Sequence, residues 1–273
     1  PGSETFYGMG RMASGIEVPF KGGEYYALKD VPHGDIRMKR YYSEVSRSWR
    51  RFFVYTPAGY DTHTTEKYPV LYLLHGGGED ERGWATQGKT DLIMDNLIAE
   101  GKAKPMLIIM LDGNMASAGF NFTGALKAFE AELMQAIIPF VEKNYRVRKE
   151  PDSRALAGLS MGGIQTLYAG LYHTDMFAHL GVFSSGWLPF YQKIADDQYE
   201  FISKNKAAID SQLRLLWIAM GGKEDIAYQN CQNMLKEFDT LKLKYTYSEY
   251  PGGHTWPVWR NNLYHFAQLL FNK

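Results

Sequence analysis

The sequence predicts an α/β protein built on a mostly parallel sheet, and three observations lead to that prediction. Short, continuously apolar runs such as 68–75 and 104–112 recur along the chain, as expected of strands buried on both faces. Segments with helical spacing of apolar residues lie between these runs. Strands that alternate with helices pair in parallel, and helices cover both sides of the sheet. We therefore expect one central sheet of about eight strands.

The first two predicted strands form an antiparallel pair. Residues 35–43 and 48–57 alternate polar and apolar side chains, a pattern typical of a β-hairpin. Further strands follow the hairpin. We predict them at 68–75, 104–112, 153–160, 178–186, 213–222 and 244–253.

Helical spacing predicts helices between these strands, at 90–102, 128–147, 161–174, about 228–241 and 257–272. Within 128–147, Pro139 lacks a backbone N–H and predicts a kink. The helix at 161–174 is rich in small residues, which suits close packing on the sheet.

The chain of 273 residues contains no internal repeat and no linker-like segment, so we predict a single domain over 31–273. Residues 1–30 show weak periodicity and are predicted to be an N-terminal extension that packs on the domain or wraps around it. Residues 187–212 exceed the length that a simple crossover needs. We predict that they form a lid or a pocket insertion.

The overall composition disfavours several classes of partner. Lys plus Arg equals Asp plus Glu at 30 each, so net charge gives no reason to expect nucleic acid or an anionic membrane. No apolar run reaches the length of a membrane span. One cysteine, Cys231, allows no intrachain disulfide. No signal peptide is recognised, and the start without Met is interpreted as processed or trimmed.

The stretch "AGLSMGG" predicts a nucleophile. Ser160 stands between Gly158 and Gly162, after a predicted strand and before a predicted helix. In a strand–turn–helix elbow the nucleophile has strained backbone angles, and side chains two residues away on either side would clash. We therefore predict that Ser160 is a nucleophile rather than only a small residue in a tight turn.

The stretch "HGGGED" after the first buried strand predicts an oxyanion hole. A Gly-rich turn at this position can aim backbone N–H groups at a developing negative charge. Gly77 is the first candidate donor and Gly76 the alternative, with the N–H of Met161 as the second donor. A phosphate-binding loop is disfavoured because neither a Walker Lys-Ser/Thr nor a G-x-G-x-x-G pattern follows.

Seven histidines are candidates for the base, and His254 fits best because it lies in a Gly-rich turn after a late strand. His75 belongs to the oxyanion turn and is predicted to brace it through hydrogen bonds. The histidines do not cluster at the spacing of metal ligands, so no metal site is expected.

The acid that orients the base is predicted in "GGKEDIAY". Asp225 is preferred to Glu224, and the chain order Ser160, Asp225, His254 is the order found in α/β-hydrolases. The alternative for Asp225 is a cap on the helix that begins near Ala227. A serine, histidine and aspartate of this kind cleave the bond between an acyl group and its leaving group through an acyl-enzyme, without a cofactor or metal.

Motifs along the chain together resemble the esterase D-like α/β-hydrolases. Within that group the chain looks most like the family 1 carbohydrate esterases, the feruloyl esterases associated with bacterial xylanases. The resemblance covers about residues 31–272 and implies an α/β-hydrolase fold with the triad on Ser160, Asp225 and His254. The motifs that carry it are "RRFFVYTPAGYD", "YPVLYLLHGGGEDERGW", "AGLSMGG", "GGKEDIAYQN" and "PGGHTWPVWRNNLYHFAQLLF".

The resemblance implies hydrolysis of esters between hydroxycinnamic acids and the arabinose of plant xylan. The expected substrate is then a feruloylated xylo-oligosaccharide or arabinoxylan, and the expected location is secreted or periplasmic. Relatives that remove acetyl groups, cleave siderophore esters or transfer acyl chains to sugars leave those activities open. A non-catalytic carbohydrate-binding domain is a further alternative, which the complete set of site motifs disfavours.

A feruloyl group needs a flat apolar slot, and aromatic walls suit its ring. Trp84, Trp187 and Trp256 lie beside the site motifs and are the candidates for substrate contact. Trp256 is preferred because it lies two residues from His254. The alternative for each is packing of its own loop. The sequence gives no indication of the oligomeric state.

Overall fold

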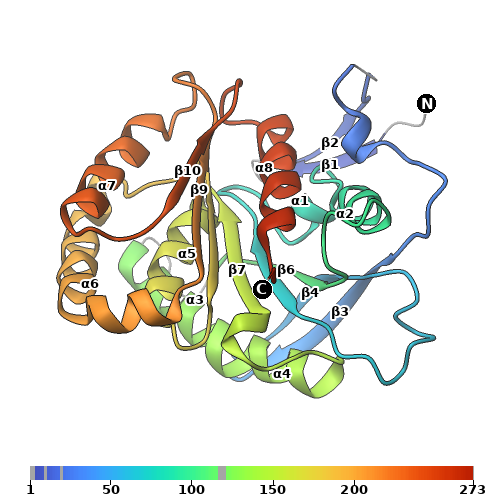
Figure 1. Ribbon diagram of the computed structural model, residues 1–273, viewed down its shortest axis with the longest axis horizontal. Coiled ribbons are helices and arrows are strands. Elements are labelled where there is room, and N and C mark those ends of the chain that lie inside the picture. The colour runs from blue at the N-terminus through green and yellow to red at the C-terminus, as the bar shows by residue number, and fades with distance from the viewer. Residues whose placement is uncertain (1–3, 9–10, 19–20, 116–120, 273) are drawn as a thin grey trace.

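The computed structural model describes residues 4–8, 11–18, 21–115 and 121–272, and its centre is an eight-stranded sheet (Figure 1). Six neighbouring strands pair in parallel, and the second strand from one edge pairs antiparallel with both of its neighbours. The prediction of a mostly parallel sheet of about eight strands is confirmed. In sheet order the strands are β10 (Thr246–Glu249), β9 (Leu215–Met220), β8 (His179–Phe183), β7 (Arg154–Leu159), β5 (Val70–Leu74), β6 (Leu107–Leu111), β4 (Ser48–Thr56) and β3 (Asp35–Ser43).

The buried strands and the hairpin form where the sequence pattern predicts them. Every residue of β5 and β6 is buried, which explains their continuous apolar runs. The hairpin of β3 and β4 pairs Ser43 with Ser48 at its turn, and β4 pairs antiparallel with β6. The turn end of this hairpin therefore extends past the carboxyl end of β6.

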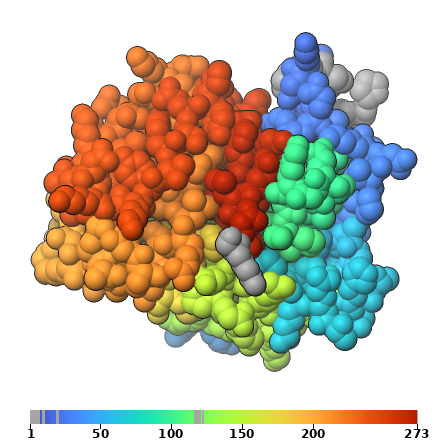
Figure 2. Space-filling model, viewed as in Figure 1, coloured from blue at the N-terminus to red at the C-terminus, as the bar shows by residue number. Residues whose placement is uncertain are grey.

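Helices cover both faces of the sheet, and each face has its own apolar core. Figure 2 shows α8 in red beside α2 in green on one face. That face carries α1 (Arg82–Ala85), α2 (Thr90–Ala99) and α8 (Trp256–Leu269). The other face carries α3 (Phe122–Glu132), α4 (Ile138–Asn144), α5 (Met161–Tyr172), α6 (Gln192–Gln212) and α7 (Tyr228–Thr240). The remaining short 3-10 turns are η1 (Glu24–Tyr26), η4 (Pro151–Ser153) and η5 (Pro189–Tyr191).

The kink predicted at Pro139 takes the form of a π-helical turn. Residues Leu133–Ile137 (η3) are π-helical and join α3 to α4 directly before Pro139. A π turn changes the hydrogen-bond spacing, so the missing N–H of the proline ring is tolerated inside a long helix.

The N-terminal residues pack on the α2 and α8 side of the domain. Two strands, β1 (Glu4–Gly8) and β2 (Arg11–Gly15), form a separate antiparallel pair. Further along, the Asn96 side chain of α2 donates to the carbonyls of Tyr25 and Ala27 at 3.0 and 2.9 Å. The boundary near residue 30 between extension and domain stays a prediction.

The region predicted as a lid or insertion is mostly the helix α6. Ile202 and Ile209 of α6 are buried, and the Gln198 amide donates to the carbonyl of Leu167 in α5 at 2.8 Å. α6 is therefore part of the helical layer. The segment before it, 188–191, is the part that reaches the site described below. In the described part of the chain, no helix is long and apolar enough to span a membrane.

Candidate active site

The predicted site residues follow the carboxyl ends of neighbouring strands. The Gly-rich turn follows β5, Ser160 follows β7, Asp225 follows β9 and His254 follows β10. In parallel sheets this edge is where side chains from distant parts of a chain meet. Ser160 and His254 line the same cavity, of about 490 Å³.

Ser160 occupies a strained turn between β7 and α5. Its φ and ψ are 52° and −113°, outside the regions that side-chain-bearing residues favour. A Cβ on Gly158 would lie 2.4 Å from the backbone carbonyl of Gly162. The prediction that both flanking glycines are sterically required is confirmed. The carbonyl of Ser160 accepts a hydrogen bond from the Ser185 hydroxyl at 2.7 Å, which helps hold the turn.

His254 is oriented by Asp225. The Nδ1–H of His254 donates to Asp225 Oδ1 at 2.8 Å, which leaves Nε2 with its lone pair for a partner on the other side of the ring. The same oxygen accepts the N–H of Ala227 at 2.9 Å, in the turn that precedes α7. The N-cap of α7 is Ala227, so the alternative interpretation of Asp225 as the cap of this helix is wrong.

The Asp225 carboxylate is held in its charged form inside the protein. Burial alone raises the pKa of this group, but the hydrogen bonds from His254 and from the Ala227 amide more than compensate, and the pKa lies below its ordinary value. Asp225 is the carboxylate that bonds to His254, whereas the Glu224 carboxylate lies against Gly222.

His75 braces the Gly-rich turn, as predicted. Its Nδ1–H donates to the carbonyl of Gly76 at 2.8 Å, and its Nε2 accepts the N–H of Gly113 at 3.0 Å. These two contacts tie the ring to both the turn and the loop after β6. The carbonyl of His75 also accepts the N–H of Gly162 at 3.1 Å, which joins the turn to the start of α5.

The geometry favours Gly77 over Gly76 as an oxyanion donor. The Gly76 amide donates to Glu79 Oε2 at 3.3 Å, so it is already engaged. Gly77 lines both cavities beside Ser160, and a Cβ built on it meets nothing within 4 Å. Met161 is the first residue of α5 and lines the second of these cavities. The N-terminus of a helix favours negative charge.

The second cavity beside Ser160 is largely apolar and has a volume of about 450 Å³. Its apolar walls come from several separate elements, so no local sequence signal marks them. Gly113, Asn114 and Gln165 add polar groups. The apolar residues that line it are Met115, Leu126, Ile164, Leu188, Phe190 and Tyr191.

The three tryptophans predicted as substrate contacts have different places. Trp256 lines the His254 cavity. Trp84 is only 1% exposed and donates its Nε1–H to the carbonyl of Leu74, so its prediction as a substrate contact is wrong. Its ring packs edge-on against Trp256 and Phe183, in support of the site. Trp187 is buried and lies edge-on to Tyr191, so direct substrate contact by Trp187 stays a prediction.

Glu79 is a site residue that the sequence analysis missed. Its carboxylate accepts hydrogen bonds from Trp256 Nε1 at 2.8 Å and from the Gly76 amide. It therefore joins the oxyanion turn to the loop that carries His254. Burial raises the pKa of Glu79, and these hydrogen bonds only partly offset that effect.

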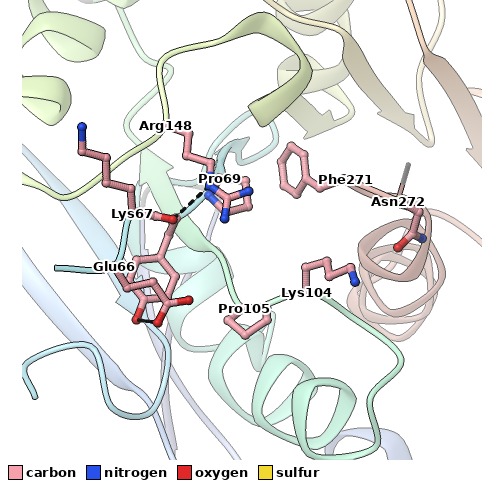
Figure 3. A pocket seen from close by; sticks show the side chains of 9 residues that line it. Glu66, Lys67, Pro69, Lys104, Pro105, Arg148, Phe271 and Asn272 are labelled. Carbon is pink, nitrogen blue, oxygen red and sulfur yellow. Dashed lines mark hydrogen bonds between the residues drawn. The ribbon is translucent and has the colours of Figure 1, made fainter. Parts of the chain in front are cut away.

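Another cavity, of about 570 Å³, lies at the opposite edge of the sheet (Figure 3). It is bordered by residues next to the amino ends of β5 and β6 and by the C-terminal residues Phe271 and Asn272. Arg148 Nε donates to the carbonyl of Lys67 there at 3.0 Å. None of the residues predicted for the site borders this cavity. Within the described ranges, no cluster of His, Cys, Asp or Glu could hold a metal ion.

Comparison with known proteins agrees with the geometry. The strand order, the elbow and the chain order of the site residues define an α/β-hydrolase fold. A family model described as "Putative esterase" matches residues 43–268, and the chain belongs to this family.

Similar proteins are named as xylanases and feruloyl esterases. An "Endo-1,4-beta-xylanase/feruloyl esterase" from Xylanibacter ruminicola is 36% identical over 99% of this chain. "Endo-1,4-beta-xylanase Y" from Acetivibrio thermocellus is 26% identical over 90% of it. A solved feruloyl esterase module from Clostridium thermocellum, a mutant complexed with sinapinate, is 26% identical with a TM-score of 0.76 over 95% of each chain. The chain spans 36% and 24% of the length of the two curated relatives.

Proposed function

We propose that this protein is a serine esterase that releases ferulic or related hydroxycinnamic acids from feruloylated arabinoxylan. One observation carries the proposal: Ser160, in its strained elbow, borders the His254 cavity on one side and an apolar cavity on the other. The volume and apolar walls of the second cavity suit a flat aromatic acyl group. The names of the similar proteins support the same substrate class.

Ser160 acts as the nucleophile in this proposal. His254 Nε2 removes the hydroxyl proton as Oγ attacks the ester carbonyl, and it then protonates the leaving alcohol. Asp225 fixes the ring with its proton on Nδ1 and stabilises the imidazolium that forms. Water then attacks the carbonyl of the acyl-enzyme while His254 removes a proton from it. His254 returns this proton to Ser160 Oγ, so the acid is released and Ser160 is restored.

The tetrahedral oxyanion is stabilised by the backbone N–H groups of Gly77 and Met161. Removal of one such donor typically costs about 3–4 kcal/mol of transition-state stabilisation. The Gly77 turn is held by His75 and Glu79, so the donor is in place before substrate arrives. This preorganisation is the source of its catalytic value.

The aromatic acyl ring packs in the apolar cavity, where Leu126, Ile164 and Phe190 line the walls. Trp256 lies on the leaving-group side, with His254. The association of relatives with xylanases favours a polysaccharide substrate outside the cytoplasm, so we place the enzyme in a secreted or periplasmic setting. The segment 188–191 contributes cavity wall, and a closing motion of this segment over the acyl group is part of the proposal.

The experiment that tests this function compares hydrolysis of methyl ferulate, methyl p-coumarate and p-nitrophenyl acetate. We expect the wild type to release acid from both hydroxycinnamate esters, because their rings bury apolar surface in this cavity. Phe190→Ala should lower kcat/KM for methyl ferulate by about tenfold and leave the acetate ester unchanged. Phe271→Ala, at the cavity of Figure 3, is the matched control. Cleavage of the acetate ester without cleavage of either hydroxycinnamate would contradict the hydroxycinnamate assignment and favour a small-acyl esterase.

A further inference from the structure

A third cavity lies next to the site, at the turn end of the β3–β4 hairpin. Its volume is about 500 Å³, and we call it the hairpin cleft. β4 runs antiparallel to β6, so its first residues extend past the carboxyl end of β6 into the edge of the sheet that carries Ser160. The residues that line the cleft include Arg40, Trp49, Arg51, Glu79, Asp80 and Asn114.

The hairpin cleft shares walls with both cavities beside Ser160. Asn114 also lines the apolar cavity, and Glu79 also lines the His254 cavity. The Asn114 side chain donates to the backbone carbonyl of Glu79 at 2.8 Å, so these two residues together form the partition. The cleft is therefore adjacent to both cavities beside Ser160.

Trp49 gives the cleft an exposed aromatic surface. Its side chain is 72% exposed, although a ring of this size is normally buried for its apolar area. The ring of Tyr42, opposite Trp49 in the hairpin, meets it edge-on with the centroids 5.8 Å apart. The Tyr42 ring therefore contacts the indole of Trp49, and most of the indole surface stays open to solvent. The apolar face of a sugar ring packs on an aromatic surface of this kind.

The polar residues of the cleft suit an uncharged ligand with many hydroxyl groups. Arg51 pairs with Glu81 and lies 3.9 Å from Asp80, and Arg50 lies 3.6 Å from Asp112. These ion pairs hold planar guanidinium and carboxylate groups in place and balance most of the local charge. A ligand with its own strong charge gains little there, whereas vicinal hydroxyls find both donors and acceptors.

We propose that the hairpin cleft binds the oligosaccharide part of the ester substrate, with a sugar ring on Trp49 and hydroxyl groups on Arg40 and Asn114. This inference rests on the proposed function for the identity of the ester. His254 protonates the leaving sugar hydroxyl, so the sugar chain leaves the reaction centre on the His254 side. Glu79, which lines that side, is also the wall of the cleft.

The test separates the sugar part of the substrate from the acyl part. Trp49→Ala should lower kcat/KM for a feruloylated arabinoxylo-oligosaccharide by about tenfold, mainly through KM, since one stacked ring is lost. Its kcat/KM for methyl ferulate should not change, because that ester has no sugar. Trp49→Phe should restore part of the loss. Met38→Ala removes another exposed apolar side chain from the same hairpin outside the cleft, and should change neither value.

A direct binding measurement completes the test. Unesterified xylotetraose is titrated calorimetrically into the wild-type protein and into Trp49→Ala, and we expect the Kd to rise about tenfold in the variant. An equal loss of kcat/KM on the feruloylated oligosaccharide and on methyl ferulate would overturn the inference. No difference in the Kd for xylotetraose between the two proteins would overturn it as well. Failure of the wild type to cleave methyl ferulate would instead overturn the proposed function, while Trp49-dependent xylotetraose binding would still support the cleft.

Discussion

Two histidine–carboxylate pairs in this protein have nearly the same geometry and different surroundings. His254 meets Asp225 at 2.8 Å, and His173 meets Glu130 at 2.6 Å. His254 uses Nδ1 and lines a cavity with Ser160, so Nε2 is left for chemistry. His173 uses Nε2 and joins the end of α5 to α3, and neither member of that pair lines the cavities described beside Ser160. The pair distance alone therefore does not identify a catalytic histidine.

The largest effect should come from replacing His254 of the first pair or Ser160, which lines the same cavity. His254→Gln and Ser160→Ala should each lower kcat for methyl ferulate by about 10⁴–10⁶-fold, and the double variant should lose no more than the stronger single one, because the groups act as a unit. His173→Gln, at the other pair, should leave kcat unchanged. The measurement is steady-state hydrolysis with folding checked by circular dichroism. Substantial activity in Ser160→Ala would exclude the acyl-enzyme mechanism.

Replacing the carboxylate of each pair sharpens the comparison. Asp225→Asn should lower kcat by about 10³–10⁴-fold, since the amide no longer selects the reactive tautomer of His254. Glu130→Gln makes the same chemical change beside His173 and should not alter kcat. If Asp225→Asn kept most of its activity and lost only stability, the role of Asp225 would be limited to holding the turn before α7, through its bond to Ala227.

The elbow that presents Ser160 to His254 can be tested through stability. Gly158→Ala should lower the free energy of unfolding by about 2–4 kcal/mol, because the new Cβ would meet the Gly162 backbone at 2.4 Å. Gly77→Ala is the control, because a Cβ there has open space. Urea denaturation of both variants measures the difference. Wild-type stability in Gly158→Ala would contradict the tight packing of the elbow.

The smallest expected effect is a pH dependence from the second pair. The hydrogen bond to Glu130 raises the pKa of His173 above its ordinary value of 6.5, against the opposing effect of burial. A histidine pKa that is raised on folding contributes stability below the unfolded pKa, and this contribution is lost as pH rises through the folded pKa. We expect a contribution of about 0.5–1 kcal/mol at this partly exposed pair.

The measurement for that pair is the free energy of unfolding between pH 5 and about 9, the range over which a raised histidine pKa acts. The difference between wild type and His173→Gln should shrink as pH rises. A difference that grows with pH would mean that His173 is preferentially neutral in the folded protein, which would contradict the ion pair.

The sequence by itself determined the sheet and the elbow that carries Ser160. Strands such as β5 and β6 are buried on both faces, so their apolar runs are continuous and readable. Ser160 needs glycines two residues away on each side, and this requirement is local to the chain. The brace formed by His75 was also predictable, because it belongs to the same turn as its partner Gly76.

Only the tertiary structure decided which side chains border Ser160. The apolar cavity takes its walls from residues as distant in sequence as Met115, Ile164 and Phe190, and no spacing rule connects them. The position of Trp84 near a site motif predicts a substrate contact. In the structure its Nε1–H donates to the carbonyl of Leu74 and its ring is buried in the core. Glu79 and Trp256 are hydrogen-bonded although they lie 177 residues apart in the sequence. Contacts of this kind follow from packing between elements, which a local sequence pattern does not encode.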